Sequence, residues 1–171
     1  QLKYKRFCYG VLEKILLPRN QYRFLCYTYS CMAEYYELFA VSVDSQKKYY
    51  RLAVKYAKKS QDAYMYAFNS LYLGILETEG HPQVAESRIR EALAKPTIRE
   101  NDLMRAEGNK YLSRSLYSQG KYQAAYDALD SARKNYQKIY DARNSEQLAE
   151  AEKKYATAQE RATTKIYRPP I

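Results

Sequence analysis

The chain has 171 residues, enough for one domain with a sizeable hydrophobic core, and its 5 glycines and 5 prolines among many helix-forming residues favour helices. The 3 cysteines are an odd number, which argues against a complete disulfide framework, and no apolar run approaches the length that spans a membrane. The net charge of +10 indicates an acidic partner, a nucleic acid or a membrane surface.

The first predicted helix covers residues 3–17. Apolar residues recur along it at helical spacing, namely Tyr4, Phe7, Val11 and Ile15. Pro18 and Asn20 end this pattern. We interpret residues 1–20 as an N-terminal helix that caps the fold or forms part of a repeat.

Two helices are expected next. The first covers residues 22–41 and is crowded with aromatic residues, so it needs neighbours on two sides. Asp44 or Ser45 is the expected N-cap of the second, which runs to about Ser60. Its inner face carries Tyr50, Val54 and Ala57. Most of the 21 tyrosines suit half-buried positions between packed helices, because their rings are apolar and their hydroxyls polar.

Glycine and proline mark the boundaries of the following elements. A helix over 63–79 is expected to end at Gly80. Pro82 then begins another helix, because proline is tolerated in a first helical turn. The linker 95–97 ends that helix.

The clearest hairpin lies at residues 111–136. Its first helix begins earlier, with Asn101 or Asp102 as the expected N-cap. Gly120 ends its first helix, since glycine adopts a positive φ without steric cost. The apolar stripe before this turn is Leu112 and Leu116, and the one after it is Tyr122, Ala125, Ala128, Leu129 and Ala132. Leu129 is expected to be buried between two small residues that let a neighbouring helix approach.

One spacing motif, a residue followed by others four and seven positions later, occurs three times. Its last members are Ala57, Ala92 and Ala132, at intervals of 35 and 40 residues. This pattern resembles the tetratricopeptide repeat (TPR), with Leu112 and Ser113 in the first helix and Ala125, Leu129 and Ala132 in the second. The large aromatic residue at the start of the TPR signature is missing. HEAT-type or other helical hairpins remain an alternative.

The resemblance implies an all-α, right-handed α-solenoid of about three TPR-like hairpins over residues 21–142, with flanking helices. It also implies a concave face, lined by the first helix of each repeat, that binds a peptide or a partner helix. Helical register places the following residues on that face: Tyr27, Ser30, Glu34, Glu37, Ala67, Ser70, Gly74, Glu77, Lys110, Arg114 and Tyr117. Such a groove is acidic at one end and basic at the other, where Lys110 and Arg114 can clamp a carboxylate.

Residues 143–171 are more polar than the residues before them. Asn144 is the expected N-cap of a polar helix whose seam is Leu148, Ala151, Tyr155, Ala158 and Ala162. This helix either caps the last repeat or serves as a signalling or dimerising helix, so a homodimer through it is one expectation.

A second resemblance concerns the same helix. Leu148, Glu150, Lys154 and Tyr155 match a motif in TPR-containing regulators of the Bacteroidetes, in which repeats precede a transmembrane helix and a histidine kinase or DNA-binding output. The resemblance implies a periplasmic sensor or scaffold region, with membrane attachment only through flanking segments. The chain begins at Gln1, and we interpret it as a fragment or a processed product.

Catalysis is not expected from this sequence. The 1 histidine, His81, precedes a proline at a helix start and is interpreted as a surface turn residue. No phosphate-binding loop or hydrolase motif is present, and we expect neither a metal nor a cofactor. The predicted function is protein or peptide binding. The alternative, less favoured, is nucleic-acid binding through the positive charge, which is densest at Lys47, Lys48, Arg51, Lys55, Lys58 and Lys59.

Overall fold

The computed structural model describes residues 10–38 and 42–166, and the side chains of these except residues 13 and 158–166. The described part is helical and contains no strand, so the predicted all-α class is confirmed. Its elements are η1 (Leu12–Leu16), α2 (Tyr22–Leu38), α3 (Val43–Lys59), α4 (Ala63–Glu77), α5 (Pro82–Leu93), α6 (Pro96–Arg99), α7 (Asp102–Ser118) and α8 (Tyr122–Ile166). Of the helix predicted over residues 3–17, residues 3–9 lie outside the described part, and η1 is a single π-helical turn.

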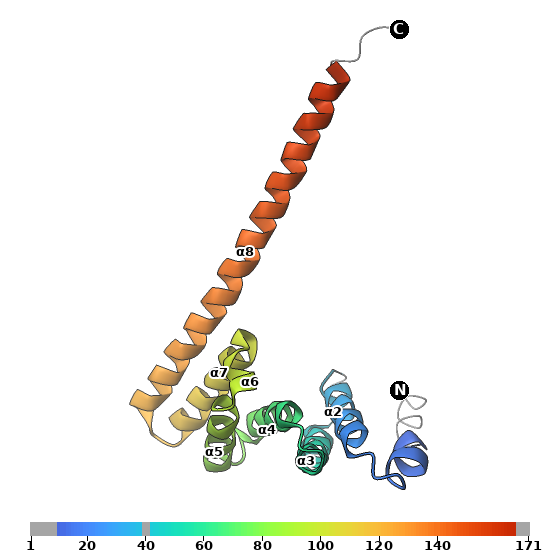
Figure 1. The fold of residues 1–171 in the computed structure, drawn as a ribbon. Coiled ribbons are helices and arrows are strands. Elements are labelled where there is room, and N and C mark those ends of the chain that lie inside the picture. The colour runs from blue at the N-terminus through green and yellow to red at the C-terminus, as the bar shows by residue number, and fades with distance from the viewer. Residues whose placement is uncertain (1–9, 39–41, 167–171) are drawn as a thin grey trace.

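Consecutive helices pack as hairpins that lie side by side (Figure 1). The pairs are α2 with α3, α4 with α5, and α7 with α8, while the short helix α6 occupies the linker where only a break was expected. Among the first helices of the hairpins, α4 also contacts both α2 and α7. One face of these three helices therefore forms a surface that crosses the row of hairpins.

Tyrosine supplies much of the core of the first hairpin. Tyr29 stacks on Tyr56 with ring centroids 5.6 Å apart, and Tyr36 packs on Tyr49 at 5.4 Å. All four side chains are buried. The prediction that tyrosines pack between helices is confirmed for this group.

The small residues of the repeated motif are buried as predicted. Ala57, Ala92 and Ala132 are each at most 1% exposed. Leu129, however, is 53% exposed, and the prediction that it is buried is wrong. The reason is helical geometry: α8 meets α7 through Ala125, Ala128 and Ala132, and Leu129 is rotated about 100° away from Ala128.

The helix caps are partly as predicted. Asn101 accepts a hydrogen bond from the Met104 backbone N–H, which confirms it as the N-cap of α7. The N-cap of α3 is Ser42, which precedes both expected candidates. Gly120 has φ +75° and closes α7, because the backbone N–H of Lys121 donates to the carbonyl of Leu116 at 3.0 Å.

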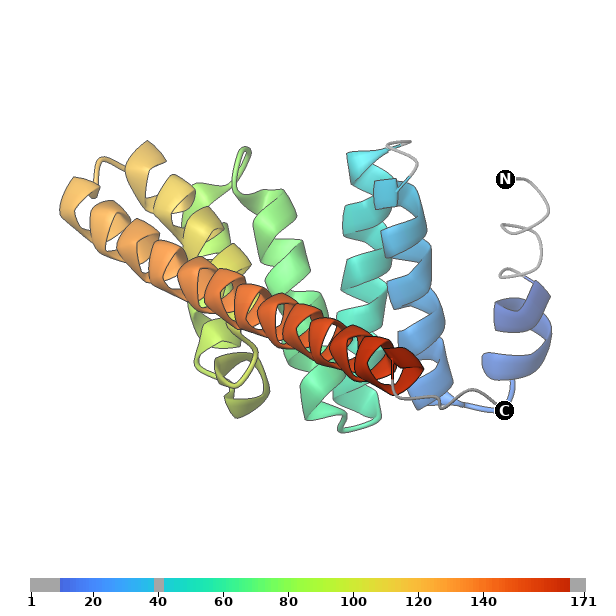
Figure 2. The ribbon, with the colours of Figure 1, turned by 90° about the horizontal axis from the view of Figure 1, so that it is seen from above.

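Helix α8 is continuous for 45 residues, so Asn144 lies within it and is not an N-cap. The expected boundary between residues 142 and 143 falls inside this helix. No glycine or proline interrupts the sequence there, and asparagine costs a helix only a fraction of 1 kcal/mol. Beyond the hairpins α8 rises away from them (Figure 1), and seen from above it passes in front of the other hairpins (Figure 2). Within the described residues, no helix is long and apolar enough to cross a membrane.

Candidate peptide-binding face

The exposed side of α4 carries an aromatic ladder, which we define as Tyr64, Phe68 and Tyr72. The residues are four apart and therefore follow one another along one side of the helix. Ring centroids are 6.2 Å apart between Tyr64 and Phe68 and 4.7 Å apart between Phe68 and Tyr72. Tyr64 is 44% exposed and the other two rings are half-buried. None of the three was predicted as a site residue.

The α4 residues predicted for the concave binding face lie on the side of the helix opposite the aromatic ladder, and they are buried. Ala67 and Ser70 are at most 2% exposed, and a Cβ on Gly74 would meet Ile89 Cγ1 at 2.9 Å. Small residues recur on the side of α4 that packs against α5, so their spacing marks the packing side and not the open side. The register predicted for α4 is therefore wrong.

Glu77 is also buried, in contact with helices α3 and α5. Its carboxylate accepts a hydrogen bond from Arg88 Nε of α5 at 2.9 Å and lies 3.5 Å from Arg51 of α3. The side chain is 5% exposed. Glu77 therefore joins three helices and is not available to a ligand.

The α2 residues fit the prediction better. Tyr27 is 40% exposed, and Glu34 and Glu37 are exposed. Ser30 is buried, and its hydroxyl donates to Glu34 Oε1 at 3.5 Å. Three of the four predicted side chains on this helix are therefore open to solvent.

On α7 the predicted residues lie on the open side. Lys110 and Arg114 each lie over the ring of Tyr111, at 5.1 Å and 5.0 Å from its centroid. Lys110 also pairs with Glu107 at 3.3 Å, and the hydroxyl of Tyr136 in α8 donates to Glu107. Tyr117 is 67% exposed and packs edge-on against Tyr122 at 5.3 Å. Sequence reasoning missed Glu107, Tyr111 and Tyr136, although the first two share the helical face of Lys110 and Arg114.

Carboxylates on α2 and α7 influence the pKa of Tyr72 on α4. Burial raises the pKa of Tyr72 above its usual value, and the carboxylates of Glu37, Glu107 and Glu34 raise it further. Partial removal from water raises the pKa of Glu34, and nearby Glu37 adds to this, while the Ser30 hydrogen bond acts in the opposite direction. Carboxylates from α2 and α7 therefore both act on Tyr72, the last residue of the aromatic ladder. We call this combined surface, Glu34, Glu37, the aromatic ladder, Glu107, Lys110 and Arg114, the first-helix face.

Tyr50 of α3 lies beside this face. Its ring stacks on Tyr72 with centroids 5.8 Å apart, and its side chain is 1% exposed. Burial raises the pKa of its hydroxyl, as do the nearby Glu37 and Glu34. Within the described structure this hydroxyl has no hydrogen-bond partner.

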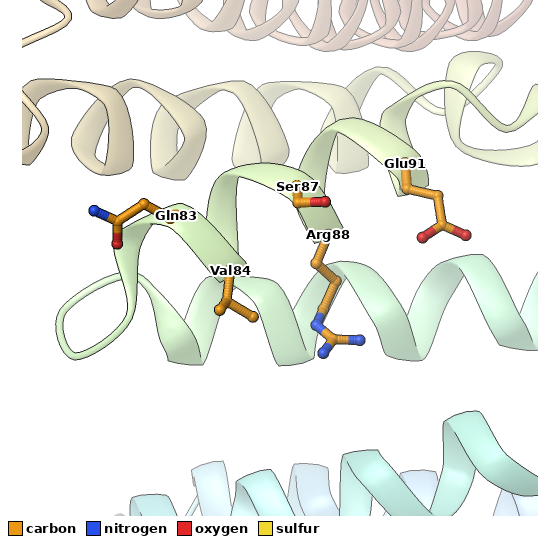
Figure 3. Close-up of a pocket in the computed structure, with 5 residues that line it drawn as sticks. All are labelled: Gln83, Val84, Ser87, Arg88 and Glu91. Atoms are coloured by element: carbon orange, nitrogen blue, oxygen red, sulfur yellow. The ribbon is translucent and has the colours of Figure 1, made fainter.

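The described surface also has pockets, and two of them are defined by their lining residues. One, of about 360 Å³, lies between α7 and α8 and is mostly apolar, with Leu129, Tyr136 and Tyr140 in its wall and Lys110 at its edge. The other, of about 390 Å³, is formed by residues of α5, namely Gln83, Val84, Ser87, Arg88 and Glu91 (Figure 3). Figure 3 shows Arg88 pointing from α5 toward α4, consistent with its bond to Glu77.

The basic residues predicted on α3 share one side of that helix. Their positions fall within about a third of a turn, and all but the half-buried Lys47 are exposed. Lys48, Lys55 and Lys59 lie over tyrosine rings at 5.0–5.9 Å, and Arg51 reaches Glu77. We call Lys47, Lys48, Arg51, Lys55, Lys58 and Lys59 the α3 basic face.

The described side chains contain no group of three His, Cys, Asp or Glu that could hold a metal ion. His81 is exposed at the start of α5.

Comparison with family models, curated proteins and solved structures found no match to this chain. The TPR resemblance therefore rests on the sequence motifs alone.

Proposed function

We propose that this chain is a protein- or peptide-binding helical-repeat module, and that the first-helix face holds an extended segment of a partner protein. The observation that carries the proposal is the partly exposed aromatic ladder on α4, with carboxylates on the neighbouring α2 and cations on the neighbouring α7. Aromatic side chains supply large contact area at little entropic cost, and flanking charges fix orientation.

The chemistry of the face defines the ligand that suits it. An apolar or aromatic side chain fits on the aromatic ladder. A carboxylate fits against Lys110 and Arg114, where the planar guanidinium can bind it through two hydrogen bonds. A lysine or arginine side chain fits against Glu34 and Glu37. The preferred segment therefore has a cation, an apolar centre and an acidic end, in that order across the hairpins.

This function suits the sensor or scaffold part of a larger signalling regulator, with the hairpins arranged as a right-handed solenoid. Helix α8 supports such a role, because one continuous helix leads from Tyr136, in contact with Glu107 of the first-helix face, to its far end. A location in the periplasm follows only from the resemblance to membrane-anchored regulators.

Selection from a random peptide library displayed on phage tests the proposal. Enriched peptides are expected to carry the charge order given above. Phe68→Ala should weaken their binding at least tenfold, about 1.4 kcal/mol, because a ring at the centre of the face is removed. Tyr126→Ala, which removes an exposed ring from α8, serves as the matched control. Equal effects of the two variants, or failure to enrich any peptide, would contradict the assignment.

Nucleic-acid binding is the second candidate, and the α3 basic face is the observation that favours it. Its cations lie along about 18 Å of helix, a length suited to contacts with successive phosphates. Binding of a generic oligonucleotide should then fall steeply with salt, and Lys55→Glu with Lys58→Glu should abolish it. Absence of binding at low salt removes this candidate.

A further inference from the structure

The part of α8 beyond the hairpins has no packing partner within the described chain. Every described side chain from residue 141 to residue 157 is exposed. Tyr140, Leu148 and Tyr155 are 61%, 62% and 72% exposed, high values for large apolar side chains. Because helices in water are held mainly by packing of an apolar face, this segment needs a partner to cover it.

The large apolar side chains of the segment lie along one side, while several alanines lie on the opposite side. At about 100° per residue, Tyr140, Asn144, Leu148, Ala151 and Tyr155 fall within about a quarter of a turn. The steps from Leu148 onward are 3 and 4, the spacing of a left-handed coiled coil, and Ala158 and Ala162 continue it in the sequence. The two steps of 4 around Asn144 correspond to a stutter, which unwinds a coiled coil locally without ending it. We call these five residues the α8 seam.

We propose that the α8 seam pairs with the same seam of a second copy of this chain, as a parallel, in-register, two-stranded coiled coil. Asn144 is one reason for choosing a second copy. An asparagine within a seam is satisfied best by its own counterpart across the axis, which requires identical helices in register. Ala151, the layer after Leu148, lets the two helices approach closely.

The charges beside the seam favour the parallel arrangement. With Leu148 at position a and Ala151 at position d, Gln147 and Lys154 occupy g positions and Glu152 an e position. In a parallel pair Gln147 faces Glu152 of the second copy, so no like charges meet. An antiparallel pair centred on the same residues would place Lys154 against Lys154 and Glu152 against Glu152, which is unfavourable.

The first test is the mass of the whole chain by light scattering or sedimentation over a range of concentrations. We expect twice the monomer mass at high concentration. Leu148→Glu with Tyr155→Glu should raise the dissociation constant of the dimer at least about tenfold, because charges would be buried in the seam. Ala149→Glu with Ala156→Glu introduces the same charges on the opposite side of the helix and should leave the dimer intact.

The second test fixes the direction and register. In a chain whose native cysteines are replaced by serine or alanine, Leu148→Cys should form a disulfide with its counterpart under oxidising conditions, and Ala149→Cys should not. A chain that stays monomeric, a dimer that tolerates the seam variant, a trimeric mass, or an uncrosslinked Leu148→Cys dimer would each overturn the proposal. Far-UV circular dichroism verifies that each variant keeps its helices.

Discussion

Gly74 lies where α4 and α5 come closest, and its lack of a side chain makes that approach possible. A Cβ there would meet Ile89 Cγ1 at 2.9 Å, with Arg88 Cβ and the Ile89 backbone nitrogen at 3.4 Å. These atoms belong to the body of a packed helix and cannot move aside freely. Gly74→Ala should therefore lower the free energy of unfolding by about 1–3 kcal/mol, measured by urea denaturation.

Gly80 provides the control for this prediction. A Cβ at position 80 would meet no atom within 4 Å. Gly80→Ala should leave stability unchanged or raise it slightly, because alanine restricts the unfolded chain. Similar losses for both variants would mean that the gap between α4 and α5 is not the cause.

Gln61 occupies the same kind of turn as Gly120 without being glycine. Its φ is +56°, and the Asp62 backbone N–H donates to the carbonyl of Ala57, as in the turn after α7. A side chain in the left-handed region carries a steric cost that glycine avoids. Gln61→Gly should thus raise the free energy of unfolding by about 0.5–1 kcal/mol, and Gly120→Ala should lower it by about 1 kcal/mol. The thermal midpoint measures both changes. A change of the same sign at both positions would contradict this explanation.

Glu86 of α5 holds the turn between α7 and α8. Its Oε2 accepts hydrogen bonds from Lys121 at 2.7 Å and from Gln119 at 3.0 Å. The Lys121 bond, with those from Arg90 and Gln119, lowers the pKa of Glu86 below its usual 4.5, although burial acts in the opposite direction. Because the pKa is lower in the folded state, this carboxylate stabilises the fold above the unfolded pKa, and its contribution is lost as pH falls through the folded pKa.

Glu86→Gln should consequently destabilise the protein at pH 7 by about 0.5–1.5 kcal/mol. The difference from the unmodified chain should shrink as the pH falls below 4.5. Urea denaturation at several pH values measures this, with the exposed Glu79→Gln as control. A difference that stays constant between pH 7 and pH 3 would show that the charge of Glu86 is not responsible.

At the scale of elements, glycine, proline and N-cap residues predicted several helix boundaries correctly. The spacing of apolar residues predicted the buried side of each helix less well. Gly120, Pro82 and Asn101 have local backbone roles that a sequence displays directly, and the structure has each at its expected boundary. Helix α4 misled because it is apolar or small on nearly every side, so periodicity cannot separate the packing side from the open side. The aromatic ladder could have been found from its spacing of four residues.

Helix α8 shows a different limit of sequence reasoning. Asn144 and the change to polar residues after Tyr140 suggested a new helix. A helix can nevertheless continue into solvent wherever no residue breaks it, and nothing local to Asn144 marks the end of packing against α7. The exposure of Leu129 also depends on α7. The position of α7 decides which side of α8 is buried, and the hydrophobicity of Leu129 does not.

Across the whole molecule the core is divided into two clusters that meet at α4. One draws its buried residues from η1, α2 and α3 and includes Met65 and Leu73 of α4. The other runs from Ala67 and Leu71 of α4 to Ala128 of α8. Residues of one helix thus belong to different clusters, and the two halves of the described chain meet in α4.

This division predicts separable stability, as expected for chains in which each unit contacts only its neighbours. Leu25 is fully buried in the first cluster, and Leu25→Ala should cost about 2–5 kcal/mol there. Native-state amide hydrogen exchange should show lost protection in α2 and α3 but retained protection in α7. Leu116→Ala, in the second cluster, should give the reverse pattern. Loss of protection along the whole chain in either variant would mean that α4 binds the two clusters into one cooperative unit.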